Sequence, residues 1–251
     1  TDMRGVDSVQ PSKNEYAWAI TYVPMKRINT PKYDFRHFVG LAYNAASGTG
    51  IASAFTYGTS LTTTTRTFTI QKQIDNLYQQ FNGCAIGRLT VRGSIDNPIE
   101  IMAEGFASAA TNNADLGSTS ATSLVSATPF LWQDAQIYID GSLATNCTAF
   151  EFTLNNNDEN AYVLGDRDPR DVLHKIRTID VSITKFYTNV GQYLAAKNST
   201  AKSITLDLTD SASTVRFGFR GCKYDAHPIP APIEGILTHT LRLKAASAFL
   251  T

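Results

Sequence analysis

The sequence of 251 residues predicts an all-β protein: an antiparallel β-sandwich or barrel with one short flanking helix. Hydrophobic and polar residues alternate with a period of two along most of the chain, which is typical of strands that bury one face. Tight-turn dipeptides separate these runs, and stretches with helical periodicity are few. One-sided strands favour antiparallel sheets, because the strands of parallel sheets are buried on both faces.

The expected strands follow one another along the chain, and their apolar positions are often β-branched or aromatic, as a pleated surface prefers. The alternating runs are residues 16–22, 99–104, 150–155, 179–184, 204–209, 215–220 and 237–244. Turns at strand ends are expected at Asn82-Gly83, Asp140-Gly141 and Glu234-Gly235. Residues 94–98 break another pair of strands.

Helix is expected in few places. Asn189–Lys197 has apolar residues at helical spacing and is the best candidate for the flanking helix. Asp168 followed by Pro169 resembles an N-cap with proline at the first helical position, which predicts a single turn through Leu173. Leu77–Phe81 is expected as another short turn.

The chain divides into residues 65–251, the expected sandwich core, and residues 1–64, an N-terminal arm or set of strands that decorates it. The core contains a long loop, residues 107–129, which is rich in Ala, Ser, Thr and Asn and is too long for an ordinary hairpin. Two interpretations stay open: a disordered loop, or a loop ordered by packing on a neighbouring subunit. In the second, the apolar contacts come from Leu116, Leu124, Val125 and Phe130.

Composition argues against several classes of protein. Lys plus Arg and Asp plus Glu both number 22, and proteins that grip nucleic acid through its phosphates usually carry a basic excess. Three cysteines, far apart in sequence, predict buried reduced thiols and synthesis in a cytoplasm rather than a disulfide framework. Neither a membrane-spanning apolar stretch nor a signal peptide is visible, so no membrane partner is expected.

No motif for catalysis, cofactor binding or metal binding is present. The four histidines are not spaced as pairs of metal ligands: His37, His174, His227 and His239. The Asp166, Asp168 and Asp171 cluster is interleaved with arginines, which favours a self-paired surface loop over an acid/base or calcium site. Glu100 and Glu104 share a strand face, but nothing supplies the aromatic platform of a glycoside hydrolase. We therefore expect no enzyme activity.

A series of short motifs, in order, resembles the tail tube proteins of long-tailed phages and related archaeal viruses. Tyr78 with Phe81-Asn82-Gly83-Cys84 resembles the family's "y-x-x-f-x-G-c" turn. Pro98–Ile101 with Glu104-Gly105 resembles its "p-v-e-v-x-x-x-x-G" strand. The later motifs are Pro129-Phe130 with residues 134–141, Phe150–Asn155, Leu164-Gly165, Pro169, Arg177 and residues 234–245. The match covers roughly residues 65–245.

The resemblance implies a structural protein of the virion tail, made in the host cytoplasm, without enzyme activity or cofactor. In that family six copies form a ring, their strands join into one barrel, and the rings stack into a tube through which DNA leaves. The implied partners are further copies, other tail proteins and passing DNA that is not bound by sequence. A neutral or acidic lumen lets DNA slide, so the candidates to line it are three alternative strand faces: that of Glu100 and Glu104, that of Glu151, or that of Asp207.

Two alternatives stay open. One is another virion β-protein, such as a tail-completion, baseplate or capsid-decoration subunit. The other is a carbohydrate-binding β-sandwich. Long hollow tubes in the electron microscope favour a tail tube protein, isolated small rings or monomers favour the second class, and glycan binding by a monomer favours the third.

Overall fold

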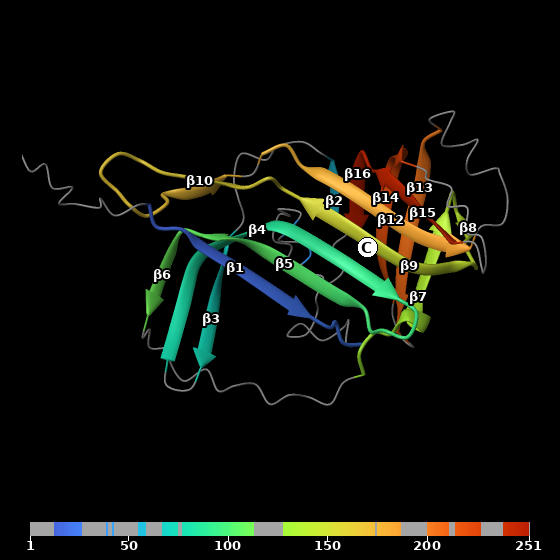
Figure 1. The fold of residues 1–251 in the computed structure, drawn as a ribbon, viewed down its shortest axis with the longest axis horizontal. Helices are drawn as coiled ribbons and strands as arrows, with labels where there is room; N and C mark the ends of the chain where they lie inside the picture. The colour runs from blue at the N-terminus through green and yellow to red at the C-terminus, as the bar shows by residue number, and fades with distance from the viewer. Residues whose placement is uncertain are drawn as a thin grey trace, which may run out of the picture.

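The prediction of an all-β antiparallel sandwich is confirmed. The structure, a computed structural model, describes residues 13–26, 39, 42, 55–58, 67–74, 77–112, 128–173, 175–186, 200–210, 214–226 and 238–250. These residues form sixteen strands and the 3-10 turn η2 (Trp132–Asp134), with every strand pair antiparallel (Figure 1). No helix in the described part of the chain is long and apolar enough to cross a membrane.

Six strands form what we call the first sheet. Their order is β1 (Tyr16–Tyr22), β5 (Glu100–Ala107), β4 (Leu77–Ser94), β9 (Cys147–Asn155), β12 (Thr178–Phe186) and β15 (Thr238–Lys244). Strands 1, 5, 4, 9 and 12 run side by side along the longest axis of the molecule (Figure 1). The first sheet therefore has two faces, two side edges at β1 and β15, and two ends where its strands stop.

The second sheet packs across the first. It is formed by β2 (Phe55–Gly58), β16 (Ser247–Leu250), β14 (Thr214–Ala226), β13 (Lys202–Thr209), β7 (Ala135–Ile139) and β8 (Ser142–Leu143). Strand β14 is long enough to serve both sheets, because Lys223–Ala226 pair with β15 while earlier residues pair with β13 and β16. This shared strand links the two layers of the sandwich along one side.

The core lies between the two sheets. The inward positions of the alternating strands meet there, and the ring of Phe152 in the first sheet contacts those of Phe217 and Phe219 in the second, each at a centroid distance of 5.1 Å. All three phenylalanines are almost fully buried. Burial of each such side chain stabilises the fold by about 1.5–3 kcal/mol.

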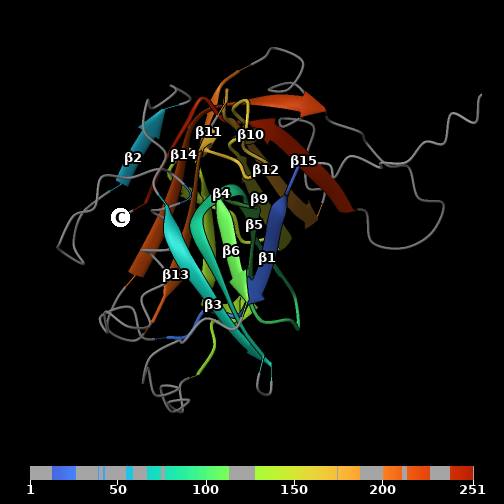
Figure 2. The same ribbon diagram turned by 90° about the vertical axis from the view of Figure 1, so that its left-hand side faces the viewer.

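Two smaller units extend from the same end of the first sheet, where β9 finishes at Asn155 and Arg88 of β4 lies opposite it. The N-terminal half of β4 leaves the sheet and pairs with β3 (Phe68–Ile74) and β6 (Ala109–Asn112), with Gly83 in the left-handed region at φ +63°. Strands β10 (Glu159–Ala161) and β11 (Asp171–Leu173) form a separate hairpin (Figures 1 and 2). We call this unit the β10–β11 hairpin.

Both short helical turns predicted within the described residues are wrong. Leu77–Phe81 lies in β4, where it pairs with β3 and in part with β6, and Asp171–Leu173 is β11. The Asn82-Gly83 pair does not end a strand but lies inside β4. The Asp140-Gly141 turn is confirmed: it joins β7 to β8 with φ values of +51° and +78°.

Other sequence predictions fall partly or wholly outside the described residues. Asn189–Lys197, the expected flanking helix, and Glu234-Gly235 lie outside them. Of residues 107–129, β6 occupies 109–112, and residues 113–127 are not described. From residues 1–64, β1 and β2 are strands of the two sheets, and Val39 and Ala42 are fully buried. The division into arm and core stays a prediction.

Candidate functional site

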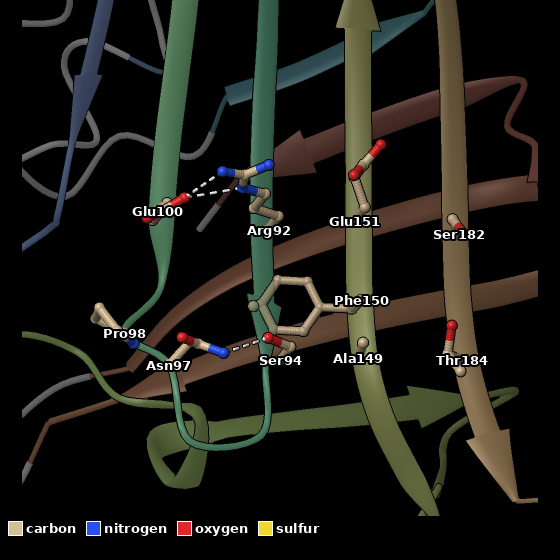
Figure 3. A pocket seen from close by; sticks show the side chains of 11 residues that line it. Arg92, Ser94, Asn97, Pro98, Glu100, Ala149, Phe150, Glu151, Ser182 and Thr184 are labelled. Atoms are coloured by element: carbon tan, nitrogen blue, oxygen red, sulfur yellow. Dashed lines mark hydrogen bonds and ion pairs between the residues drawn. The ribbon is translucent and has the colours of Figure 1, made fainter.

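The outer face of the first sheet, the face turned away from the core, gathers most of the sheet's charged side chains. Strand alternation turns one set of residues outward, and the antiparallel register then aligns them in rows across the sheet. One row consists of Glu100, Arg92, Glu151, Ser182 and Arg242 on successive strands. Figure 3 shows the first four of these side chains next to one another on β5, β4, β9 and β12.

The neighbouring row crosses the middle of the outer face and is less charged. It consists of Thr21, Met102, Thr90, Thr153, Asp180 and Lys244. The hydroxyl groups of Thr90 and Thr153 hydrogen bond to each other at 3.1 Å, so these two nearly buried groups satisfy one another. The centre of the outer face is therefore polar but carries fewer charged side chains than the first row.

Charges on the outer face balance. Within the described strands of the first sheet and the adjoining end of β14, five carboxylates face outward with five cationic groups. These are Glu100, Glu104, Glu151, Asp180 and Asp225, with Arg88, Arg92, Lys223, Arg242 and Lys244. Three pairs are in contact: Arg92–Glu100 at 2.7 Å, Lys244–Asp225 at 3.1 Å and Arg88–Glu104 at 3.6 Å. Such exposed ion pairs contribute only about 0–1 kcal/mol each, so their side chains can separate and form other contacts at little cost.

Shallow hollows lie along the outer face of the first sheet. One, of about 420 Å³, is lined by residues including Arg92, Glu100, Phe150 and Glu151 (Figure 3). In the described part of the chain no three His, Cys, Asp or Glu side chains are placed to hold a metal ion. Burial raises the pKa of the Cys84 thiol to about 11 and that of Cys222 to about 12, so neither is a thiolate near neutral pH.

Both side edges of the first sheet are open within the described residues. No described strand pairs with the outer edge of β1. At the other side β14 pairs only with Arg242–Lys244 of β15, which leaves the outer edge of residues 238–241 without a described partner. A row of free N–H and C=O groups at a strand edge is a template for pairing with another chain.

The family model described as phage tail tube protein matches residues 28–242. The chain belongs to this family. A search of curated proteins found no match. Membership makes the chain a structural component of a phage tail, and the matched residues include most of both sheets.

In this tail tube protein, three of the four residues predicted to line a lumen lie together. Glu100, Glu104 and Glu151 all point outward from the first sheet. Asp207 is not among them, because β13 belongs to the second sheet. There its carboxylate accepts two hydrogen bonds from Arg216, from Nε at 2.8 Å and from Nη2 at 2.6 Å.

The residues predicted to contact a neighbouring subunit do not form a described surface. Leu116, Leu124 and Val125 lie outside the described residues. Phe130 is fully buried in the core of its own chain. Its backbone N–H and C=O pair with Pro24 and Ile99, so it closes the sandwich and offers no side-chain surface to a partner.

A buried polar network at one end of the first sheet of this tail tube protein was not predicted from the sequence. The Asn156 side-chain amide is fully buried and donates to the carbonyls of Ile86 at 2.7 Å and Ala42 at 2.9 Å. Its oxygen accepts from Arg177 Nε at 2.6 Å. The network ties β4, the connection from β9 to β12 and Ala42 together. The sequence carries no signal for it, because two of the partners lie 70 and 114 residues away.

Proposed function

We propose that the chain assembles into closed rings, hexameric as in the tail tube family, which stack into a tube whose lumen carries DNA out of the virion. One observation carries the proposal: the first sheet combines a polar, charge-balanced outer face with side edges that are open within the described residues. The outer face lines the lumen, and the side edges join neighbouring copies.

The topology of the first sheet favours sideways joining. Its six strands alternate in direction, so β1 and β15 run in opposite directions. Copies related by rotation about a tube axis keep their strand directions relative to that axis. The open edge of β15 in one copy therefore meets β1 of the next copy antiparallel, with the hydrogen-bond pattern that is slightly more stable per residue.

The positions of the two edges give a geometry that suits a closed barrel. Across the sheet Ala19, at the middle of β1, lies level with Thr178 of β12, whereas Thr240 lies level with Thr184. Joining Ala19 to Thr240 of a neighbour shifts copies by about 20 Å along the strands. Over six strands, about 29 Å wide, this shift tilts the strands by about 35°, within the usual range for barrels.

The charge balance of the outer face suits a channel for DNA. A basic lumen binds phosphates and holds DNA in place. Here Arg88 and Arg92 are engaged by Glu104 and Glu100, which keeps the guanidinium groups from presenting an uncompensated positive field. The result is a wetted surface with no net attraction for the phosphate backbone.

The proposal is tested by assembly of the purified protein and by cross-linking of the two edges. Negative-stain microscopy at increasing protein concentration should show closed rings and hollow tubes. In a Cys147→Ala background, since Cys147 is only half-buried, the double variant Ala19→Cys, Thr240→Cys should form a disulfide-linked ladder of copies up to the ring size.

The matched control replaces Ala19→Cys with Thr209→Cys on the second sheet, which should give no ladder. A protein that stays monomeric at all concentrations contradicts the proposal. Rings that form without the Ala19–Thr240 ladder, while the control pair does cross-link, contradict the assignment of the edges.

A further inference from the structure

We propose that the tip of the β10–β11 hairpin of one copy docks into an uncharged hollow at the opposite end of the first sheet of a copy in the next ring. This inference rests on the proposed function. If the outer face lines the lumen and the side edges join copies within a ring, the two ends of the first sheet are the surfaces left for stacking.

The β10–β11 hairpin carries a concentration of exposed apolar side chains. Leu164 at its tip is as exposed as in an extended chain, and Val163 beside it is 41% exposed. Leu173 and Ile176 at the base of the hairpin are 49% and 70% exposed. Single exposed apolar residues are normal on a protein surface, but several on one small projecting unit mark an interaction site.

The tip is held in place by hydrogen bonds to the segment that leads into β1. Asp168 Oδ1 accepts from Asn14 Nδ2 at 2.6 Å and from the Tyr16 hydroxyl at 2.8 Å. The Tyr162 hydroxyl donates to the carbonyl of Asn14 at 2.8 Å. These contacts brace the loop that carries Leu164, so docking it costs little conformational entropy.

The opposite end of the first sheet has a hollow of about 300 Å³ that can receive such a tip. Three large apolar side chains on its rim are exposed: Ile95 by 41%, Trp132 by 42% and Leu143 by 50%. None of the residues that line it is Lys, Arg, Asp or Glu. An uncharged hollow with aromatic and aliphatic walls suits an apolar side chain better than a polar or ionic group.

The two features face opposite directions along the same strands. Strand β9 begins at Cys147, which lines the hollow, and ends at Asn155, from which the chain enters the hairpin. Nine strand residues separate the two by about 30 Å. Figure 1 shows β10 toward one end of the molecule and β8, which carries Leu143, at the other.

A projection at one end and a receiving hollow at the other make a heterologous contact. Such a contact cannot close between two copies, and it repeats to give an open stack. The occupant we infer for the hollow is therefore a second copy of this chain. In a tube every hairpin except those of one terminal ring would be covered.

The test compares three variants with the wild-type protein by negative-stain microscopy and sedimentation velocity. Leu164→Asp should leave rings intact but raise the protein concentration needed for tubes at least about tenfold. The reason is that every contact between rings would then bury a charge in place of a leucine. Adding Leu143→Lys in the same chain should restore tubes by placing an opposite charge in the hollow. Met102→Asp, a similar change at a 37% exposed site on the outer face, should leave stacking unchanged.

The outcomes separate this inference from the proposed function. Tubes of Leu164→Asp that form at the wild-type concentration overturn the inference and leave the ring proposal standing. Loss of tubes that Leu143→Lys does not restore, or equal loss in Met102→Asp, overturns the pairing of hairpin and hollow. Wild-type protein that forms rings but never tubes overturns stacking, and wild-type protein that stays monomeric overturns the proposed function itself.

Discussion

The two sheets of the sandwich use their charged residues differently. On the outer face of the first sheet the side chains of Arg88 and Glu104 are both more than half exposed and lie 3.6 Å apart. In the second sheet the side chain of Asp207 is only 5% exposed and binds Arg216 through two hydrogen bonds. The charges of the first sheet are available to whatever passes over them, whereas the Asp207 pair is committed to holding strands together.

The position of β13 explains the difference. Asp207 lies between β14 and β7, and the Arg216 side chain covers it from the neighbouring strand. The hydrogen bond from Arg216 to Asp207 raises the pKa of the guanidinium above its ordinary value. In the arrangement we propose, the second sheet faces the outside of the tube and has no use for adjustable charges, whereas the first sheet lines the lumen.

The largest expected difference in stability is between two glycine-to-alanine variants, one in the first sheet and one in the β7–β8 turn of the second. A Cβ at Gly105 would overlap the carbonyl oxygen of Ala85 in the bulged part of β4, whereas a Cβ at Gly141 would meet nothing within 4 Å. Gly105→Ala should lower the free energy of unfolding by about 3 kcal/mol or more, since the backbone must shift. Gly141→Ala should cost about 1–2 kcal/mol, from its φ of +78° alone. Denaturant unfolding of both variants measures the difference.

Equal losses in the two glycine variants would show that the close approach of β4 and β5 is not rigid. Only the Gly105 variant should also weaken assembly, because β5 lies next to the β1 edge. The Gly141 variant serves as its control.

A smaller effect is expected from the charges themselves. Asp207→Ala removes a nearly buried carboxylate that accepts two hydrogen bonds from the half-exposed Arg216 side chain, and should cost about 1.5–3 kcal/mol of stability. Glu100→Ala removes the same kind of partner from Arg92 on the exposed outer face and should cost less than about 0.5 kcal/mol. Thermal or denaturant unfolding distinguishes them. If Glu100→Ala proves as costly as Asp207→Ala, the outer face is not the adjustable surface described above.

Alternation in the sequence predicted which side chains share a face but not which sheet a strand joins. It correctly placed Glu100 and Glu104 on the same face of β5, and it gave Glu151 the same polar position on β9. The same reasoning applied to Asp207 could not show that β13 pairs with β14 and β7 in the other layer. Sheet membership depends on pairing over long sequence separations, which a period-two pattern does not encode.

The two predictions of helical turns are wrong for the same physical reason. Asp168 resembled a helix cap, yet its carboxylate accepts from Asn14 and Tyr16, more than 150 residues earlier. Asp171–Leu173 then pair with β10 rather than coil. In both this segment and Leu77–Phe81, contacts with other strands override a local preference that was weak to begin with.

The variant with the smallest expected effect on stability should have the largest effect on how much DNA the assembled tube retains. The triple variant Glu100→Gln, Glu104→Gln, Glu151→Gln keeps the shape of the outer face but leaves Arg88 and Arg92 without carboxylate partners. Each change should alter stability by less than about 0.5 kcal/mol. Assembled tubes of the variant should retain short duplex DNA in a nuclease-protected form, and retention should fall steeply with salt, because the lumen now neutralises phosphates.

Wild-type tubes should retain none, and neither should a control that removes three carboxylates outside both the outer face and the β10–β11 hairpin: Glu15→Gln, Asp96→Asn and Asp210→Asn. DNA that binds the triple variant but stays open to nuclease would place the outer face of the first sheet on the outside of the tube. The lumen would then have to be sought on the second sheet, where Asp207 is held by Arg216.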